Sequence, residues 1–157
     1  MIIRFNLNGV PAAPDCNPES RLLQILREQF GLLTVRCGCT SGYCGACSVL
    51  LNGELVPSCM VAMFTIKGKS VVTLEGFRAS GEYGEILDGF REAGYNPCDY
   101  CRPGKVLGIH ALLKKIPLPE ENEILSGLSG HHCRCNEYSS LIRAVTLVSL
   151  KFSRRRS

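Results

Sequence analysis

Ten of the 157 residues are cysteines, and these are the side chains of this sequence that could do the most chemistry. A cysteine can form a disulfide, bind a metal ion or take part in redox exchange. Structural disulfides are not expected to persist in a reducing cytosol, so this number of cysteines indicates metal ligands or redox chemistry there. A secreted disulfide scaffold and a zinc protein are the alternatives.

The first cysteine group has the spacing C-x4-C-x2-C and a more distant fourth member: Cys39, Cys44, Cys47 and Cys59. This spacing is typical of plant-type two-iron ferredoxins, whereas zinc sites prefer two pairs of closely spaced ligands. Because the bridging sulfides of such a cluster are negative, the loop around them must present backbone N–H groups and few side chains. Glycines permit this close approach and positive φ angles, and the loop contains Gly38, Gly42 and Gly45. We therefore predict a [2Fe–2S] cluster at this group.

The second cysteine group consists of a C-x2-C pair, Cys98 and Cys101, and a C-x-C pair, Cys133 and Cys135. Each pair precedes the start of an expected helix. The free N–H groups and the dipole of a helix N-terminus favour an anionic cluster there. The spacing alone is also compatible with zinc, so both kinds of site remain open for this group.

The remaining cysteines and two histidines have simpler interpretations. Cys37 falls outside the ferredoxin spacing, and we expect it to be a small residue packed beneath the loop. Cys16 has no partner nearby in the sequence and is interpreted as a buried apolar thiol. Histidine replaces cysteine at Rieske-type irons, but all four cysteines of the second group are present. His131 and His132 are therefore not expected to be ligands.

The elements expected around the first group are those of a small mixed domain over residues 1–76. Alternating apolar residues predict strands on both sides of two Asn-Gly dipeptides, which favour tight hairpin turns. These strands cover residues 3–7, 10–13, 48–51 and 54–58, and a further β-branched strand covers 71–75. Leucines at helical spacing between Asn17-Pro18 and Gly31 predict a helix over 18–30.

The elements expected around the second group are helices. Residues 77–84 have the glycines and charges of a linker, and residues 85–157 form the second domain. Four helices are predicted there: one ends at Gly94, two open at Pro103 and Pro119, and the last covers 138–150. Helices of this length make a compact four-helix bundle. The fold class is therefore α+β, with one cysteine group in each domain.

The charge and hydropathy patterns exclude other classes of protein. The net charge is +4, but the basic residues are scattered apart from 154–156, which we interpret as a solvated tail. A nucleic-acid interface needs a basic face with stacking aromatic residues, and the sequence has neither. The longest apolar stretches, such as 145–150, are far shorter than the roughly 20 residues of a membrane span. Arg4 and Asn6 interrupt the leader of a secreted protein, so we expect a cytoplasmic location.

Taken together, the motifs resemble the small iron–sulfur subunit of the molybdenum hydroxylases, the xanthine oxidase (xanthine dehydrogenase) family. Residues 36–47 (RCGCTSGYCGAC) are similar to that family's ferredoxin loop, and residues 52–59 are similar to its continuation. Residues 73–76 (TLEG) match the motif that closes its first domain. Residues 98–104 resemble the family's C-G-x-C-T-P-G, and residues 129–138 resemble its G-N-L-C-R-C-T-G-Y. The resemblance covers nearly the whole chain.

The resemblance implies a β-grasp ferredoxin domain followed by a four-helix domain, each with one [2Fe–2S] cluster. The first cluster would be held by Cys39, Cys44, Cys47 and Cys59, and the second by Cys98, Cys101, Cys133 and Cys135. The family hydroxylates a substrate carbon with oxygen from water, and electrons pass from molybdenum through the two clusters toward FAD. The second cluster lies nearer the molybdenum–pterin cofactor. A large molybdopterin-binding subunit and a FAD-binding subunit would be the partners, in a heterotrimer or its dimer.

The expected function is therefore one-electron relay in an oxidoreductase complex, with no residue of this chain catalytic on substrate. Xanthine or another purine is the expected substrate of the complex, and N-heterocycles, aldehydes and carbon monoxide are alternatives. A free-standing [2Fe–2S] electron carrier or redox sensor, without a molybdenum partner, is the rival class of function.

Eight positions around the second group depart from the family's pattern: Pro97, Asp99, Arg102, Lys105, His131, His132, Asn136 and Glu137. Pro97 stands where the family commonly has a glutamine that contacts the pterin, and proline has neither a side-chain amide nor a backbone N–H. We expect several of these residues on the surface that faces the molybdenum subunit. Lys105 stands where the family has an apolar residue. The positive charges of Arg102 and Lys105 would raise the reduction potential of the cluster. Asp99 would oppose them, and Arg134 would steady that surface or the charge of the cluster.

Overall fold

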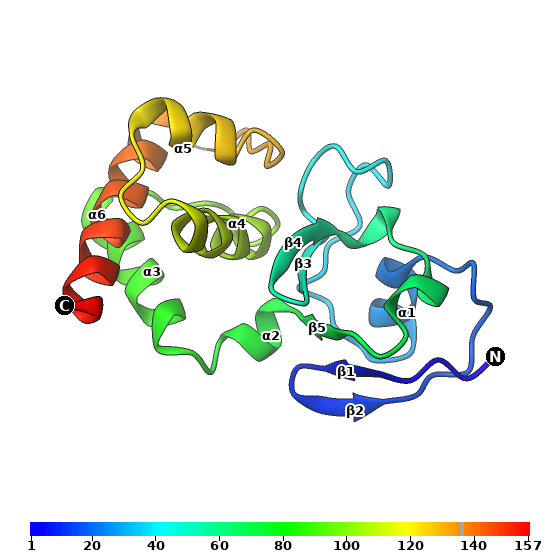
Figure 1. The fold of residues 1–157 in the computed structure, drawn as a ribbon. Coiled ribbons are helices and arrows are strands. Elements are labelled where there is room, and N and C mark those ends of the chain that lie inside the picture. Colours follow the sequence, from blue (N-terminus) through cyan, green and yellow to red (C-terminus); the bar gives the residue numbers. More distant parts are fainter. Residues whose placement is uncertain (136) are drawn as a thin grey trace.

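In the computed structural model, which describes residues 1–135 and 137–157, the first half of the chain builds a five-stranded mixed sheet (Figure 1). The strand order is β2-β1-β5-β3-β4. The strands are β1 (Phe5–Leu7), β2 (Val10–Ala12), β3 (Ser48–Leu51), β4 (Glu54–Pro57) and β5 (Ser70–Val72). β1 runs parallel to β5, and the other neighbouring strands are antiparallel. Helix α1 (Leu22–Glu28) and two 3-10 helices, η1 (Ser58–Met60) and η2 (Met63–Ile66), complete this part.

Both Asn-Gly dipeptides form the hairpin turns that the sequence predicts. Asn8 and Gly9 have φ angles of 52° and 85°, and Asn52 and Gly53 have φ angles of 49° and 83°. Two consecutive residues with positive φ give the backbone twist that matches paired antiparallel strands. The turns therefore fix the registers of β1 with β2 and of β3 with β4.

Helix α1 begins four residues later than the predicted start at residue 18. The side chain of Asn17 accepts a hydrogen bond from the N–H of Glu19 at 2.9 Å. The backbone carbonyl of Asn17 accepts one from the N–H of Ser20 at 3.0 Å. Arg21 is then extended and forms a β-bridge with Ala62. Pairing with a distant segment thus replaces the first turn of the predicted helix.

Helices α2 (Leu74–Phe77) and α3 (Gly81–Ala93) occupy most of the segment that was expected to be a strand end and a linker. The predicted strand 71–75 ends at Val72, because the N–H of Thr73 donates to the side chain of Asn8 at 2.8 Å. The hydroxyl of Ser80 caps α3 by accepting the N–H of Tyr83 at 3.3 Å. Only residues 78–80 separate the two helices. The division of the chain into domains 1–76 and 85–157 stays a prediction.

The remaining helices are α4 (Arg102–Lys115), α5 (Glu121–Gly127) and α6 (Tyr138–Arg156). They begin near the predicted positions, but α6 extends beyond residue 150 and includes the three terminal arginines. Arg155 forms a salt bridge with Glu82 of α3 at 3.0 Å and lies over the ring of Phe152 at 5.3 Å. Residues 154–156 are exposed, as expected of solvated residues, but they belong to a helix and do not form a tail.

Two hydrophobic cores organise the molecule, and α4 lies where they meet. The first core packs α1 against the sheet, with Ile3, Leu22 and Leu26 fully buried. The second core packs α3, α4 and α6 together, and it includes Leu50 of β3. Helix α4 is buried from Pro103 to Leu113, because β3 and β4 cover it from the sheet side while helices cover its other faces (Figure 1). Within residues 1–135 and 137–157, no helix is both long and apolar enough to span a membrane.

Candidate iron–sulfur centres

The loop over residues 36–46 folds around the sulfur of Cys39. The backbone N–H groups of Ser41, Tyr43 and Cys44 donate to Cys39 Sγ at 3.4, 3.2 and 3.3 Å. Consecutive N–H groups that converge in this way form an anion-binding concavity. The loop therefore stabilises negative charge on the sulfur, as the ligand of an anionic cluster requires.

The other sulfurs of the first group are fixed by the strand and the 3-10 helix that follow the loop. Cys47 and Cys59 are each only 3% exposed. The carbonyl of Cys47 accepts hydrogen bonds from the N–H and the hydroxyl of Ser58 at 3.2 and 2.7 Å. The N–H of Gly42 donates to Cys59 Sγ at 3.3 Å. The structure thus brings the distant Cys59 to Cys47 and to the loop that contains Cys39 and Cys44.

Hydrogen bonding and burial shift the pKa values of thiols in the first group in opposite directions. Hydrogen bonds from Ser41, first through its side chain and then through its backbone, lower the pKa of Cys39 to about 6. Burial, reinforced by the neighbouring Cys47, raises the pKa of Cys59 to about 11. Binding of a metal deprotonates thiols and releases their protons. A bound iron would therefore provide the charge compensation that the buried thiolates lack.

Gly38 leaves space for the sulfur atoms, as the sequence pattern requires. A Cβ atom at this position would lie 2.7 Å from Cys44 Sγ. Such a contact is shorter than atoms tolerate, so a side chain here would displace the sulfur. The absence of a side chain keeps the backbone close to the sulfurs.

The second group is assembled at the N-termini of α4 and α6. The carbonyl of Cys98 accepts hydrogen bonds from the N–H groups of Cys101 and Arg102 at 3.1 and 2.9 Å, and Cys101 is the N-cap of α4. Cys133 and Cys135 lie in the segment that leads into α6. Both pairs therefore stand at helix beginnings, as the sequence predicts.

The thiols of the second group are close enough to perturb one another. The N–H of Cys101 is the main cause that lowers the pKa of Cys98, and Cys135 contributes through a side-chain hydrogen bond. Burial raises the pKa of Cys101 to about 12, with contributions from Cys133 and Cys98. A hydrogen bond with Cys98 is the main cause that raises the pKa of Cys135. The fold thus brings all four cysteines of this group together.

Each group contains four cysteines, the number and kind of ligand that a [2Fe–2S] cluster takes. Within the described residues, no three histidine, cysteine or carboxylate side chains converge as tightly as the ligands of a single metal ion do. A [2Fe–2S] cluster has two irons, and each iron takes two of the four thiolates, so its ligands need not converge on one point. When bound, such a cluster takes up and releases one electron.

The two cysteine groups face each other across a tight contact (Figure 1). The loop over residues 36–46, drawn in cyan, lies opposite the orange segment that precedes α6. The N–H of His132 donates to the carbonyl of Cys44 at 3.1 Å, and its ring stacks on Tyr43 with centroids 4.3 Å apart. The hydroxyl of Tyr100 donates to the carbonyl of Cys37 at 2.6 Å. Sequence reasoning did not identify Tyr43 or Tyr100, because no local pattern shows a contact between distant segments.

Two of the departures from the family's pattern lie inside this contact. Lys105 and His131 are 3% and 9% exposed, so these two are not among the departures that could form a surface facing a partner subunit. Lys105 Nζ donates to the carbonyl of His131 at 2.5 Å, and His131 Nε2 lies 3.2 Å from the hydroxyl of Ser48. Lys105 and His131 line one cavity with Cys44 and Gly45 of the first loop, and the sequence pattern of α4 alone does not indicate this contact.

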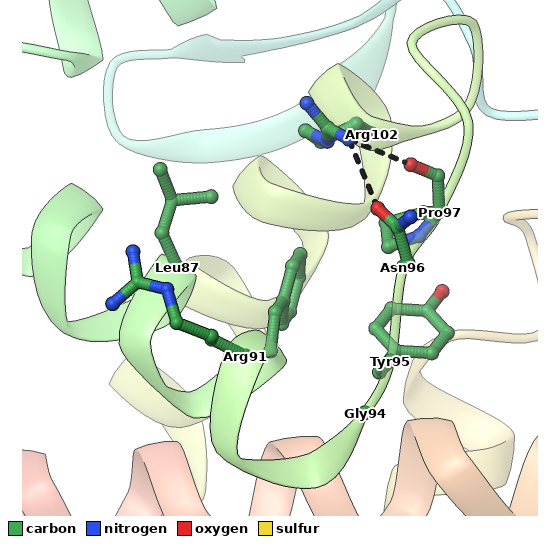
Figure 2. A pocket seen from close by; sticks show the side chains of 8 residues that line it. Leu87, Arg91, Gly94, Tyr95, Asn96, Pro97 and Arg102 are labelled. Carbon is green, nitrogen blue, oxygen red and sulfur yellow. Dashed lines mark hydrogen bonds between the residues drawn. The ribbon is translucent and has the colours of Figure 1, made fainter.

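Other departures line an open pocket of about 380 Å³ beside the second group (Figure 2). Arg102 Nη2 donates to the side-chain oxygen of Asn96 at 3.2 Å and to the carbonyl of Pro97 at 3.1 Å. Arg102 Nη1 also forms a salt bridge with Asp99 at 3.1 Å. Arg91 lines the same pocket. The charges of Arg102 and Asp99 offset each other, in line with the opposite effects that the two residues are expected to have on the potential of the second cluster.

The structure places the remaining singled-out residues as follows. Cys37 is exposed, so its interpretation as a packed residue is wrong, and Cys16 is half-buried beside the first core and not fully buried. Arg134 is exposed and Glu137 is the N-cap of α6. Asn136 lies outside the described residues.

Comparison with known protein families gives two matches that together cover most of the chain. Residues 9–80 match a family described as a 2Fe-2S iron-sulfur cluster binding domain. Residues 73–146 match a family described as a [2Fe-2S] binding domain. The two matches coincide with the two cysteine groups.

Comparison with individual proteins gives matches over nearly the full length. The nicotinate dehydrogenase small FeS subunit of Eubacterium barkeri is 41% identical over 143 residues, which are 91% of each chain. The xanthine dehydrogenase iron-sulfur-binding subunit of Escherichia coli O157:H7 is 36% identical over 148 residues, again 91% of each chain. A chain of the quinoline 2-oxidoreductase structure from Pseudomonas putida 86 is 31% identical and superposes with a TM-score of 0.88, covering 98% of this chain and 96% of that one. These matches confirm the predicted fold class and the resemblance drawn from the motifs.

Proposed function

Because the chain belongs to the family of small iron–sulfur subunits of the molybdenum hydroxylases, we propose that it relays single electrons through two [2Fe–2S] clusters from a molybdopterin site toward FAD. The first cluster is held by Cys39, Cys44, Cys47 and Cys59, and the second is held by Cys98, Cys101, Cys133 and Cys135. The chain makes and breaks no bond on substrate.

The observation that carries this proposal is the close approach of the two cysteine groups. The carbonyl of Cys44 accepts the N–H of His132, which is the residue next to Cys133. One hydrogen bond and a few covalent bonds thus connect a proposed ligand of the first cluster to a proposed ligand of the second. Such a connection suits transfer between two clusters and has no evident use at two independent zinc sites.

The residues of the chain act on the clusters by hydrogen bonding, burial and close packing. The N–H groups of Ser41, Tyr43 and Cys44 donate to Cys39 Sγ and so stabilise negative charge on that sulfur. Hydrogen bonds to ligand sulfurs, burial and nearby charge set the potentials of iron–sulfur clusters. Burial of Cys47 and Cys59 limits the access of water to the first site.

The proposed partners are a large molybdopterin-binding subunit and a FAD-binding subunit, in a heterotrimer or its dimer. The open pocket beside Pro97 and Arg102 adjoins the second group and is the place where we expect the molybdopterin subunit to dock. We propose a cytoplasmic location, because a reducing compartment keeps ten cysteines available as thiolates.

For the complex as a whole, we propose a nitrogen heteroaromatic substrate, a class that includes the purines. The relatives named above are subunits of enzymes for nicotinate, xanthine and quinoline, and all three compounds are nitrogen heterocycles. An aldehyde oxidase from Cavia porcellus is also related, at 29% identity. The choice among substrates lies in the pocket of the molybdopterin-binding partner.

The test of the cluster assignment is metal analysis and EPR of the full chain, purified without oxygen and loaded with iron and sulfide. Two clusters require about four irons and four sulfides per chain, and two rhombic EPR signals are expected after reduction with dithionite. Cys59→Ser and Cys133→Ser should each alter one signal, and Cys16→Ser should alter neither. Stoichiometric zinc without visible charge-transfer bands would contradict the proposal.

The test of the assembly is purification of the native complex from its own cells through a tag on this chain. We expect a large subunit with molybdopterin and a subunit with FAD to co-purify. A monomer that carries both clusters and is reduced by a separate reductase would instead establish a free-standing electron carrier. Turnover of the purified complex with nicotinate, xanthine, quinoline and an aldehyde then decides the substrate class.

A further inference from the structure

Lys105 is a buried lysine on a helix whose other buried side chains, apart from His110, are apolar. It lies one turn after Cys101 on α4, and only 3% of its surface is exposed. Its Nζ donates to the backbone carbonyl of His131, which is a neutral partner. Burial of an ammonium group is costly unless a nearby anion compensates its charge. The surroundings of Lys105 must therefore supply negative charge.

No carboxylate supplies that charge. Among residues 1–135 and 137–157, no salt bridge includes Lys105. Nor can the neighbouring imidazole of His131 compensate it, because an imidazole is either neutral or positively charged.

The remaining candidates for a counter-ion are the cysteines. Lys105 lines a cavity of about 40 Å³ together with Cys101 of the second group and Cys44 of the first. Burial lowers the pKa of Lys105, whereas the charges of Cys133 and Cys101 raise it. These two cysteines belong to the second group. With a cluster in place, the four thiolates, the two bridging sulfides and the two ferric irons together would carry roughly −2.

We propose that the buried ammonium group of Lys105 is the internal counter-ion of the second cluster and raises its reduction potential. The proposal rests on the proposed function, since it needs a cluster at Cys98, Cys101, Cys133 and Cys135. Reduction adds one electron and makes the cluster more negative by one charge, while Lys105 neither gains nor loses a proton. A fixed positive charge nearby stabilises the more negative state. Lys105 thus favours reduction of the second cluster and changes the fraction of electrons that each of the two clusters holds.

Arg102, another cation near the second group, differs from Lys105 in two respects. Its side chain is 35% exposed and is paired with Asp99. Water screens exposed charges and the carboxylate offsets this one, so Arg102 has a smaller effect on the cluster.

The experiment is a redox titration of the full chain with both clusters, followed by EPR. Lys105→Met removes the charge and keeps an unbranched side chain of similar length. At the wild-type midpoint of the second cluster, we expect the ratio of reduced to oxidised cluster to fall about tenfold, which corresponds to 59 mV for a one-electron couple. The first cluster should shift less. The EPR signals are assigned with the Cys59→Ser and Cys133→Ser chains.

Two further variants separate charge from structure. Lys114→Met removes an exposed lysine from the same helix and should leave both midpoints unchanged. Lys105→Gln keeps a donor for the carbonyl of His131 but has no charge, so it should behave like Lys105→Met. A wild-type midpoint in Lys105→Gln, or equal shifts in the Lys105→Met and Lys114→Met chains, would overturn the proposal.

Loss of the second cluster from both neutral variants is also informative. Lys105→Arg then decides, because it restores the charge: retention of four irons supports a counter-ion, and loss of the second cluster in this chain as well overturns it. Failure of the proposed function would appear differently, as a wild-type chain that does not bind two clusters. Iron and sulfide analysis of the wild-type chain therefore distinguishes the two failures.

Discussion

The backbone N–H of His132 donates a hydrogen bond to the carbonyl oxygen of Cys44 at 3.1 Å, and so joins the two cysteine groups through the main chain. The segments that make this bond can meet only because glycines lie between them. A Cβ atom at Gly45 would collide with the carbonyl of Gly130, and one at Gly104 would collide with the carbonyl of Gly45. Backbone atoms of the two groups therefore approach each other directly.

Gly45→Ala should open this contact. The new methyl group would meet the carbonyl of Gly130 and the ring of His131, and Gly45 also has a φ of +74° that disfavours alanine. Overpacking of this kind costs about 1–3 kcal/mol of the free energy of unfolding. We expect a lower midpoint in urea unfolding of the chain loaded with both clusters.

The matched control for this change is Gly130→Ala on the opposite side of the contact. A Cβ atom at Gly130 has no neighbour within 4 Å, so this chain should unfold close to the wild-type midpoint. Equal midpoints for Gly45→Ala and the wild type would show that the two groups are not held together as tightly as the contact indicates.

Tyr100→Phe tests a second bond between the same two parts of the molecule. The hydroxyl of Tyr100 donates to the carbonyl of Cys37 at 2.6 Å, and its removal leaves that carbonyl without this donor. We expect a loss of about 0.5–1.5 kcal/mol in the free energy of unfolding. Tyr138→Phe, at a tyrosine that is 68% exposed, is the control and should change little. If both phenylalanine chains lose the same stability, the bond to Cys37 does not stabilise the fold.

Local patterns in the sequence predict the local structure well. The two Asn-Gly turns need only their own residues to adopt positive φ, and both form as predicted. The helix starts at α4 and α6 follow the cysteine pairs as predicted, because capping and first-turn proline act within a few residues. The cysteine spacing likewise indicates which thiols the fold brings together.

Features that depend on distant residues are not evident from the sequence. Arg21 pairs with Ala62, so α1 loses its predicted first turn. Arg155 pairs with Glu82, so the terminal arginines extend a helix and do not form a tail. A lysine is ordinarily exposed, but Lys105 is buried where the segments around Cys44 and His131 meet α4. Each of these errors arises from a partner far away in the chain.

Ser41→Ala should make the thiol of Cys39 less acidic. Hydrogen bonds from Ser41 are the main cause that lowers the pKa of Cys39, and the N–H groups of Cys44 and Tyr43 contribute less. Without the hydroxyl, the pKa should rise from about 6 toward the ordinary value, because the backbone donors remain. At pH 6 the rate of alkylation by iodoacetamide in the metal-free chain should fall about twofold or more, since only the thiolate reacts.

The control for this measurement is Thr40→Ala. The hydroxyl of Thr40 donates to the carbonyl of Cys39 at 2.7 Å and not to its sulfur. The alkylation rate of Cys39 should therefore be unchanged in this chain, as followed by mass spectrometry of the labelled peptide. A rate for Ser41→Ala equal to that of the wild type at every pH would mean that the hydroxyl of Ser41 does not act on the sulfur.

Glu75→Gln tests a half-buried carboxylate that ties the loop before the first group to the end of the sheet. Glu75 accepts hydrogen bonds from the N–H and hydroxyl of Thr34 at 3.1 and 2.6 Å, and from the hydroxyl of Thr73 at 2.6 Å. Burial alone would raise its pKa, but these hydrogen bonds outweigh burial and lower it below the ordinary 4.5. A carboxyl group whose pKa is lowered by folding stabilises the protein above its unfolded pKa, and this stabilisation is lost as the pH falls through the folded pKa.

We therefore expect Glu75→Gln to unfold at lower urea concentration than the wild type at pH 7, by about 1 kcal/mol for the lost charged hydrogen bonds. The difference between the two chains should shrink when both are measured below pH 4.5, because the wild-type carboxylate is then being protonated. Glu54→Gln is the control: Glu54 pairs with Lys115 at 2.8 Å, which also lowers its pKa, but the pair is exposed and contributes little. The difference in the free energy of unfolding between Glu75→Gln and the wild type could instead stay constant with pH. That result would show that the amide disturbs packing and that the charge of Glu75 does not stabilise the fold.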